Sequence, residues 1–270
     1  MHRLLVSAET LESDQAVLPS DAAHHLKVVR PKPGETVELF DGAGRSRLYR
    51  CGASAAAPLS AAGDLAVTPP SAFKVTLFAC VTKGSRWDWT IEKATELGVT
   101  RIVPVISDRC IVRIDRRERA AKRERWQRIA EDAARQSDAK WLPEICEAVD
   151  FRDAIALAKE CMCFVGALTN PPPEPLLAAV LRSLKVSTLE SGKSPHLPTS
   201  SPPHLPTFGL FVGPEGDFTP EELKTLLEIA VPTSFGPTIL RAETAALFGI
   251  SVLVAALGLK ENPHAAPFMV

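Results

Sequence analysis

The chain has 270 residues, of which 46% are hydrophobic and 23% are charged, so it has the composition of an ordinary globular protein with one large domain or two smaller ones. Its formal net charge of −1 at pH 7 excludes a uniformly basic nucleic-acid binder, although a neutral total can conceal charged patches. The N-terminus lacks the apolar core of a secretory signal, and the longest apolar run, at residues 245–257, falls short of the roughly 18 residues that suggest a membrane span. Six scattered cysteines without a Cys-x-x-Cys pair argue against a zinc or redox site, so we expect free thiols in a cytoplasmic protein that binds neither metal nor membrane.

The first 70 residues are predicted to be rich in β-strands. Residues 36–40 alternate between polar and apolar side chains and end at Asp41 and Gly42, which are typical turn residues. A run of small residues at 53–58 and the pair Pro69 and Pro70 then mark a boundary. We therefore expect a first domain over residues 1–70 and a second domain over residues 73–270.

From residue 74 onward, short apolar runs alternate with segments of helical spacing. Strands are expected at residues 75–81, 102–106, 161–168 and 208–212, and helices at 87–97, 117–137 and 220–229. Thr219 before Pro220 is a typical helix start. This alternation predicts an α/β domain with a mainly parallel sheet. A last helix begins near Arg241 or Glu243 and is apolar almost all round, which indicates burial in a core or in a subunit interface.

A segment rich in Pro and Ser, at about residues 187–207, interrupts this pattern. The sequence Pro-His-Leu-Pro-Thr occurs twice in it, at residues 195–199 and 203–207. His196 and His204 could be interpreted as metal ligands, but a duplicated linker explains them more simply. We expect a low-complexity surface loop.

An apolar strand enters a Gly-Pro-Glu-Gly turn at residues 213–216, and a capped helix follows it. Glycines in such a turn allow a ligand to approach the backbone, although a plain strand-to-helix connection is the alternative. No Gly-Lys-Ser/Thr follows, and residues 215–228 hold five acidic residues and one basic residue. The turn therefore suits a cationic or neutral ligand better than a polyphosphate.

A second polar cluster precedes the last apolar helix, at residues 235–246. Charged side chains at the start of a buried helix need partners. One interpretation is that Glu243 faces the positive end of the helix dipole while Arg241 pairs with a carboxylate. The other is that both residues belong to a functional site.

Together these two clusters resemble the RsmE family of SPOUT-class RNA methyltransferases. The Gly-Pro-Glu-Gly loop of that family matches residues 213–216, and its Leu-Arg-x-Glu-Thr-Ala element matches residues 240–245. Further similarity covers most of the chain, at residues 24–30, 40–42, 83, 92–99 and 125–137.

The resemblance implies methylation of N3 of a uridine in small-subunit (16S) ribosomal RNA, free or in the assembled 30S subunit, with S-adenosylmethionine as the cofactor. It implies a PUA-like β-barrel followed by a SPOUT domain with a C-terminal trefoil knot, in a homodimer whose interface includes the last helix. The residues expected to bind the cofactor are Leu168, Val212, Gly213, Pro214, Glu215, Gly216, Phe235, Gly236, Ile239, Leu240, Thr244 and Ala245. Arg241 is expected to stabilise charge on a uracil oxygen, and Glu243 is a candidate base that could instead hold the cofactor or cap the helix.

Basic residues also indicate a nucleic-acid surface. Residues 101–125 hold nine basic and four acidic residues, although a solvated helix with internal ion pairs is the alternative. With the resemblance added, RNA contacts are expected at Arg30, Lys83, Arg109, Arg113 and Lys140.

The sequence departs from the family pattern at Ala139 and Thr238, where the family carries arginine. Lys140 can replace the first charge but not its bidentate geometry. Two other functions stay open: a non-catalytic RNA-binding or ribosome-assembly protein of the same fold, and a SPOUT methyltransferase that acts on transfer RNA.

Overall fold

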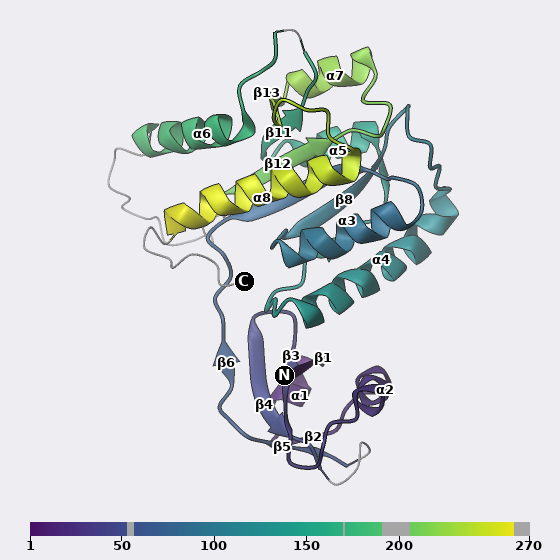
Figure 1. The fold of residues 1–270 in the computed structure, drawn as a ribbon, viewed down its shortest axis with the longest axis vertical. Helices are drawn as coiled ribbons and strands as arrows, with labels where there is room; N and C mark the ends of the chain where they lie inside the picture. The colour runs from purple at the N-terminus through teal and green to yellow at the C-terminus, as the bar shows by residue number, and fades with distance from the viewer. Residues whose placement is uncertain (53–56, 170, 191–205, 262–270) are drawn as a thin grey trace. The chain divides into compact units, whose positions relative to one another are not determined.

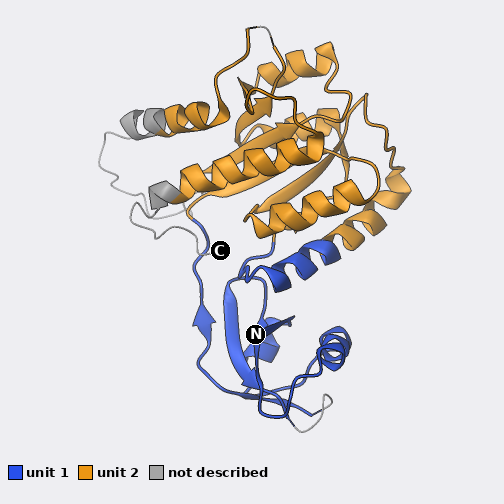
Figure 2. Ribbon diagram, in the orientation of Figure 1, with its two compact units in different colours: residues 1–71, 128–142 blue, residues 72–127, 143–270 orange. Residues whose placement is uncertain are grey.

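The computed structural model describes residues 1–52, 57–169, 171–190 and 206–261, and the chain divides into two compact units (Figure 2). Unit 1 comprises residues 1–71 and 128–142, and unit 2 comprises residues 72–127 and 143–270. The sequence analysis predicts a domain boundary at residues 70–73, with all of residues 128–142 in the second domain, whereas the structure groups residues 128–142 with unit 1. The predicted insertion at 187–207 falls largely on residues 191–205, which lie outside the described residues, and its first residues belong to a helix that ends at Glu190.

Unit 1 is built on a six-stranded sheet among its described residues (Figure 1). Its elements are β1 (His2–Leu5), α1 (Ala8–Glu12), β2 (Gln15–Ala16), α2 (Ser20–Val29), β3 (Thr36–Phe40), β4 (Arg45–Arg50), β5 (Leu59–Ala61) and β6 (Ala66–Val67). The strand predicted at residues 36–40 is confirmed as β3, while α2 was not predicted. The core includes Leu26, Leu39 and Tyr49, and the Tyr49 hydroxyl donates to the carbonyl of Ser13 at 2.8 Å.

A buried ion network attaches residues 134–140 to the sheet of unit 1. The Glu38 carboxylate lies 2.6 Å from Arg3 Nε and 2.7 Å from Lys140 Nζ, and Lys140 also binds Asp138 at 2.9 Å. Arg3 donates to the carbonyls of Ala134 and Ala139 as well. Burial opposes ionisation of Glu38, but hydrogen bonds from Lys140 and Arg3 outweigh it and hold its pKa below the ordinary value. These contacts explain why a segment far along the chain belongs to unit 1.

Unit 2 contains a parallel sheet, as the sequence predicts, with seven strands among its described residues. The strand order is β10-β8-β7-β12-β11-β13, and β9 pairs with β8. Every pair is parallel, so the carboxyl ends of the strands lie along the same edge. The strands are β7 (Lys74–Cys80), β8 (Arg101–Ile106), β9 (Glu144–Ile145), β10 (Val149–Asp150), β11 (Met162–Gly166), β12 (Thr207–Val212) and β13 (Ala230–Thr233).

The sheet core is packed by aromatic and aliphatic side chains because its central strands are apolar on both faces. Phe78 of β7 and Phe211 of β12 stack with their ring centroids 4.6 Å apart. The helices are α3 (Ser85–Glu96), α4 (Arg116–Gln136), α5 (Phe151–Ala158), α6 (Leu176–Glu190), α7 (Pro220–Leu227) and α8 (Ala242–Glu261). The predicted start of α7 is confirmed: Thr219 and Glu222 form a reciprocal capping box.

The last helix, α8, lies across one face of the sheet and contacts β7, β12, α3 and α6 (Figure 1). It buries Ile250, Leu253 and Leu257, whereas Phe248 and Ala255 on its other side are exposed. The sequence predicts burial of this apolar helix in a core or in a subunit interface, and within a single chain one side of it is buried. No helix in the described part of the chain has the length and apolar character needed to cross a membrane.

Candidate functional site

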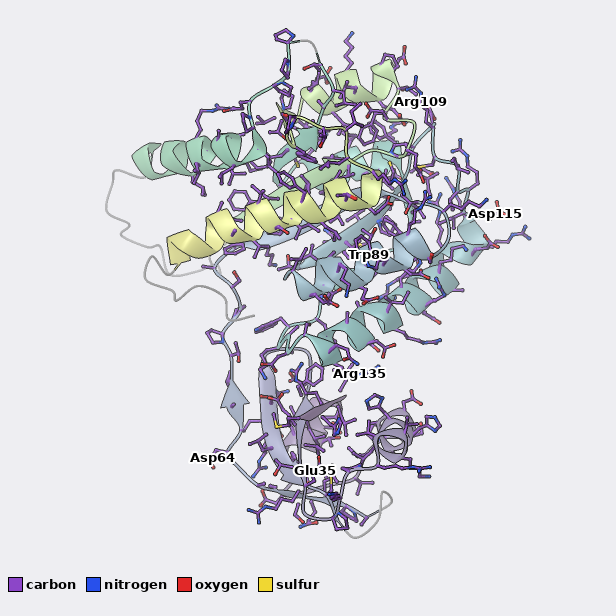
Figure 3. The ribbon with its side chains drawn as sticks, viewed as in Figure 1. Glu35, Asp64, Trp89, Arg109, Asp115 and Arg135 are labelled. Atoms are coloured by element: carbon purple, nitrogen blue, oxygen red, sulfur yellow. The ribbon has the colours of Figure 1, made fainter. Side chains whose placement is uncertain are left out.

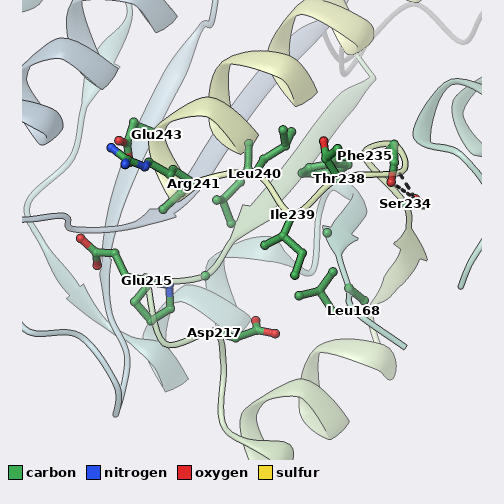
Figure 4. A pocket seen from close by; sticks show the side chains of 18 of the residues that line it. Leu168, Glu215, Asp217, Ser234, Phe235, Thr238, Ile239, Leu240, Arg241 and Glu243 are labelled. Atoms are coloured by element: carbon green, nitrogen blue, oxygen red, sulfur yellow. Dashed lines mark hydrogen bonds between the residues drawn. The ribbon is translucent and has the colours of Figure 1, made fainter. Parts of the chain in front are cut away.

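A pocket of about 500 Å³ lies at the carboxyl ends of three adjacent strands of unit 2 (Figure 4). The last residues of β11, β12 and β13, which are Gly166, Val212 and Thr233, all line it. The loops that follow these strands, the first turn of α8 and Arg86 of α3 complete its wall. This edge of a parallel sheet is where ligands of α/β proteins bind, because the loops there converge.

The pocket brings together most of the residues predicted to bind the cofactor, although they come from four separate segments. Those that line it are Leu168, Val212, Gly213, Pro214, Glu215, Phe235, Gly236, Ile239, Leu240 and Ala245. Gly216 and Thr244 were also predicted, but neither is part of the lining. A Cβ added at Gly216 would lie 3.6 Å from Arg109, and Thr244 lies on the exposed side of α8.

The loop after β12 is a tight turn held by its own atoms. Asp217 donates its backbone N–H to the Pro214 carbonyl at 2.9 Å, and its carboxylate accepts the N–H of Phe218 at 2.7 Å. Asp217 has a φ of +60°, which is uncommon for a residue with a side chain. A Cβ added at Gly213 would lie 3.2 Å from the side chains of Asp217 and Phe218, so this close turn favours glycine there.

The segment after β13 is anchored on two sides before it reaches α8. The Thr233 carbonyl accepts the N–H of Ala167 at 3.1 Å, and the N–H of Ser234 binds the Glu174 carbonyl at 2.9 Å. Gly236 then has a φ of +118°, and an added Cβ would meet nothing within 4 Å. The chain therefore bends sharply beside an open space in the pocket.

Three charged side chains meet in the pocket wall. Arg86 Nη1 lies 3.5 Å from Glu215 Oε1, and Arg86 Nε lies 3.9 Å from Glu243 Oε1. Glu243 Oε2 is buried and has no hydrogen-bond partner among the described residues. A buried acceptor without a donor is costly, so this oxygen is suited to receive a hydrogen bond from a ligand.

The remaining wall combines opposite charges with an apolar rim. Three carboxylates (Glu215, Asp217, Glu243) and two guanidinium groups (Arg86, Arg241) give the lining a formal charge of −1. At the rim, Leu168 and Ile239 are 68% and 81% exposed (Figure 4). Such exposed aliphatic side chains offer an apolar surface to a flat ring.

Sequence reasoning missed Arg86, Asp217 and Ser234 in this lining. Arg86 lies in the first turn of α3, only three residues after Lys83, yet its contacts with Glu215 and Glu243 depend on tertiary structure. Thr238, which replaces the family's arginine, also lines the pocket, and this departure therefore lies at the site itself.

The five residues predicted to bind RNA lie outside the pocket lining. Arg30 and Lys83 are exposed, and Arg30 ends α2 with a φ of +51°. Arg113 is exposed but donates to the carbonyls of Ser107 and Asp108. Arg109 donates to loop carbonyls, and Lys140 is bound by two carboxylates inside unit 1. An RNA phosphate would have to displace those carboxylates to reach Lys140, which argues against this prediction.

A family model for the RNA methyltransferase domain matches residues 69–254, which is well over half of the chain. The chain belongs to this family. The resemblance to RsmE proteins is confirmed as well. The small-subunit ribosomal RNA methyltransferase E of Bacillus subtilis is 31% identical over 181 residues, 67% of this chain and 65% of that protein. The Synechocystis protein of the same name is 28% identical over 261 residues, which are 95% of this chain and 78% of that protein.

Solved structures of similar proteins cover both units. A putative methyltransferase from Legionella pneumophila, in complex with S-adenosylmethionine, has a TM-score of 0.77 and 28% identity over 95% of this chain and 98% of its own. The ribosomal RNA small subunit methyltransferase E of Neisseria gonorrhoeae, bound to the same cofactor, has a TM-score of 0.70 and 26% identity over 97% of each chain.

Proposed function

We propose that this protein transfers one methyl group from S-adenosylmethionine to N3 of a uridine in small-subunit ribosomal RNA. Its relatives carry the name of small-subunit ribosomal RNA methyltransferases, and two similar structures contain S-adenosylmethionine. The observation that carries the proposal is the pocket, because the Gly-Pro-Glu-Gly loop and the 240–245 element, separate in sequence, line the same cavity.

The residues of the pocket fit S-adenosylmethionine. A cavity of about 500 Å³ is in the range of small-molecule sites. Its formal charge of −1 complements a ligand with a sulfonium and an ammonium group. The apolar rim of Leu168 and Ile239 suits an adenine ring. We expect the ten lining residues named above as predicted cofactor contacts to hold the cofactor, which supplies a methyl group activated by its positively charged sulfur.

The chain's own polar groups then act on the uridine. Its N3 carries a proton and becomes nucleophilic only as that proton leaves. Arg241 stabilises the negative charge that develops on a uracil oxygen. Glu243 accepts the proton at Oε2, which has no hydrogen-bond partner among the described residues. Before this transfer, Arg86 compensates the negative charge of the Glu243 carboxylate. The base must be unstacked before it enters, since its pairing edge is otherwise occupied.

We also propose that unit 2 contains the trefoil knot of SPOUT domains, built on β11, β12, β13 and α8. Strand β12 lies between β7 and β11, although β11 precedes it in the chain. The segment after β13 is bound to both ends of the loop at residues 167–176 before α8 returns to contact β7 and β12. These contacts are the ones expected where a later segment passes through an earlier loop, so they support a knot, which is rare among folds.

For RNA and partner binding, we propose that unit 1 is the PUA-like barrel and that Arg30, Lys83 and Arg113 contact the RNA backbone, because their side chains are exposed. A homodimer would cover the exposed side of α8, including Phe248 and Ala255. With ribosomal RNA as its substrate, the protein is expected to act in the cytoplasm.

The test offers purified protein three substrates: naked small-subunit ribosomal RNA, isolated small subunits and transfer RNA. Nucleoside mass spectrometry should detect N3-methyluridine in small-subunit RNA, and Arg241→Ala should abolish most of it. Activity on transfer RNA alone, or methylation of a ribose, would overturn the target. Tight cofactor binding without methylation of any RNA would instead support the non-catalytic alternative.

A further inference from the structure

Two side chains join the loop after β8 to the loop after β12, which forms one wall of the pocket. Arg109 is labelled in Figure 3. Its Nη1 donates to the carbonyls of Gly216 at 3.0 Å and Phe218 at 3.3 Å. Glu222 is buried, and its two carboxylate oxygens accept the N–H groups of Asp108 and Thr219, each at 2.9 Å. The loop after β8 thus holds the loop after β12 in place, although the loop after β8 does not itself line the pocket.

These contacts fix two peptide groups of the pocket loop at both of their ends. In the peptide group between Gly216 and Asp217, the carbonyl accepts a hydrogen bond from Arg109, and the N–H donates to the Pro214 carbonyl. In the peptide group between Phe218 and Thr219, the carbonyl accepts a hydrogen bond from Arg109, and the N–H donates to the Glu222 carboxylate. A peptide group satisfied on both sides cannot rotate without losing a hydrogen bond.

Arg109 is itself held in place by its neighbours in the chain. Cys110 is buried and its thiol accepts the N–H of Ser107, while Arg113 donates to the carbonyls of Ser107 and Asp108. On the opposite side, Phe218 is buried against Phe151, with ring centroids 5.8 Å apart. The guanidinium group therefore links two loops whose backbones are both anchored.

We propose that Arg109 is a positioning residue of the cofactor pocket, which shapes residues 213–218 through their carbonyls, rather than a contact for RNA phosphate. The inference rests on the proposed function, because it takes the pocket to be the cofactor site. Four residues of the loop line that pocket, namely Gly213, Pro214, Glu215 and Asp217. One of them, Asp217, has the left-handed conformation that needs support from its surroundings.

The test compares Arg109→Met, Arg109→Lys and the control Arg117→Met, which removes an exposed cation of the same basic segment on α4. Without cofactor, amide hydrogen exchange of Asp217 and Thr219 should be about tenfold faster in Arg109→Met, as expected for the loss of a charge-assisted hydrogen bond. Calorimetry should give an affinity for S-adenosylmethionine that is about tenfold weaker. Arg109→Lys should recover part of both effects, since an ammonium group can donate to the same carbonyls.

Binding of a small-subunit RNA fragment, measured over a range of salt concentrations, separates the two roles of Arg109. Positioning predicts that Arg109→Met leaves RNA affinity and its salt dependence near the wild-type values and raises KM for the cofactor but not for RNA. Unchanged exchange and cofactor affinity, or a weaker RNA complex with a smaller salt slope, would overturn the proposal. If the wild-type protein fails to bind S-adenosylmethionine, the proposed function is refuted, and the exchange rates alone then decide whether Arg109 orders the loop.

Discussion

Glu222→Gln removes one charge from the buried carboxylate that holds the loop after β12, while it keeps the size of the side chain. In the wild-type protein, one carboxylate oxygen accepts the N–H of Asp108 and the other accepts that of Thr219. A glutamine presents one oxygen and one NH₂ group, so in either orientation one of these backbone N–H groups faces a donor. The Thr219 hydroxyl still accepts the N–H of residue 222, so half of the capping box survives.

The expected loss follows from these contacts. A hydrogen bond to a charged group contributes about 1.5–3 kcal/mol, and a buried N–H left without an acceptor costs about 1–3 kcal/mol. These two figures overlap in what they count, so we expect the free energy of unfolding to fall by roughly 2–4 kcal/mol. Loss of a negative charge from the first turn of α7 contributes only about 0.3–1 kcal/mol of this.

The matched control is Glu221→Gln, which removes an exposed carboxylate from the same helix turn. Urea unfolding should show a loss for Glu222→Gln that exceeds the loss for Glu221→Gln by about 1.5–3 kcal/mol. Amide exchange of Asp108 and Thr219 should accelerate only in the Glu222 variant. Equal losses in the two variants would refute the reasoning, because charge at the helix start would then explain the whole effect.

Four further predictions concern the reaction, pH, the insertion and assembly. Arg241→Ala should lower kcat by about 10²–10³-fold in single-turnover assays while calorimetry shows little change in cofactor affinity, as expected for a group that binds charge developed in the transition state. The pKa of Glu38 is lowered in the folded protein, so its ionised form stabilises the fold above the ordinary value of 4.5, and this stabilisation is lost as the pH falls toward the folded pKa. The free energy of unfolding, measured in urea, should therefore fall with acid more steeply in the wild type than in Glu38→Gln, and parallel pH profiles would contradict this. Deletion of residues 194–206 should leave the melting temperature and activity near wild type, so a large drop in melting temperature would show that the segment packs on the core. Light scattering at micromolar concentration should find a dimer that Ala255→Glu converts to monomer, whereas a monomeric wild type would exclude the proposed interface.

Much of unit 2 could be predicted because its local signals agree with its tertiary structure. Apolar runs of strand length became β7, β8, β11 and β12, since a parallel sheet buried on both faces needs continuous apolar strands. Thr219 and Pro220 marked the start of α7 correctly because a cap depends only on neighbouring residues. Unit 1 was less predictable: β2 and β6 span two residues each, too short for any periodic pattern.

Most residues expected from the motifs to bind the cofactor line the pocket, and those that the structure places elsewhere share a physical cause. Gly216 belongs to the right loop, but which residues of a turn face the pocket depends on φ and ψ, which the sequence pattern does not give. Lys140 looked like a free cation because its partner Glu38 lies about a hundred residues earlier in the chain. The alternative to an RNA surface was that the basic residues at 101–125 form ion pairs within the protein. Some of these pairs are present, for example between Arg119 and Asp150 at 2.6 Å.

Unit 1 takes its last segment from residues 128–142, and this has a consequence for synthesis on the ribosome. When residue 71 has emerged, the strands of unit 1 are complete, but Lys140 is absent and the Glu38 carboxylate has only Arg3 to compensate it. Translation proceeds at about 5–20 residues per second, so residues 128–142 are synthesised several seconds after the strands of unit 1. A fragment that stops at residue 71 would keep that unfinished state permanently. We therefore expect that gene fusions or truncations ending at residue 71 would lack the residues that complete the ion network around Glu38.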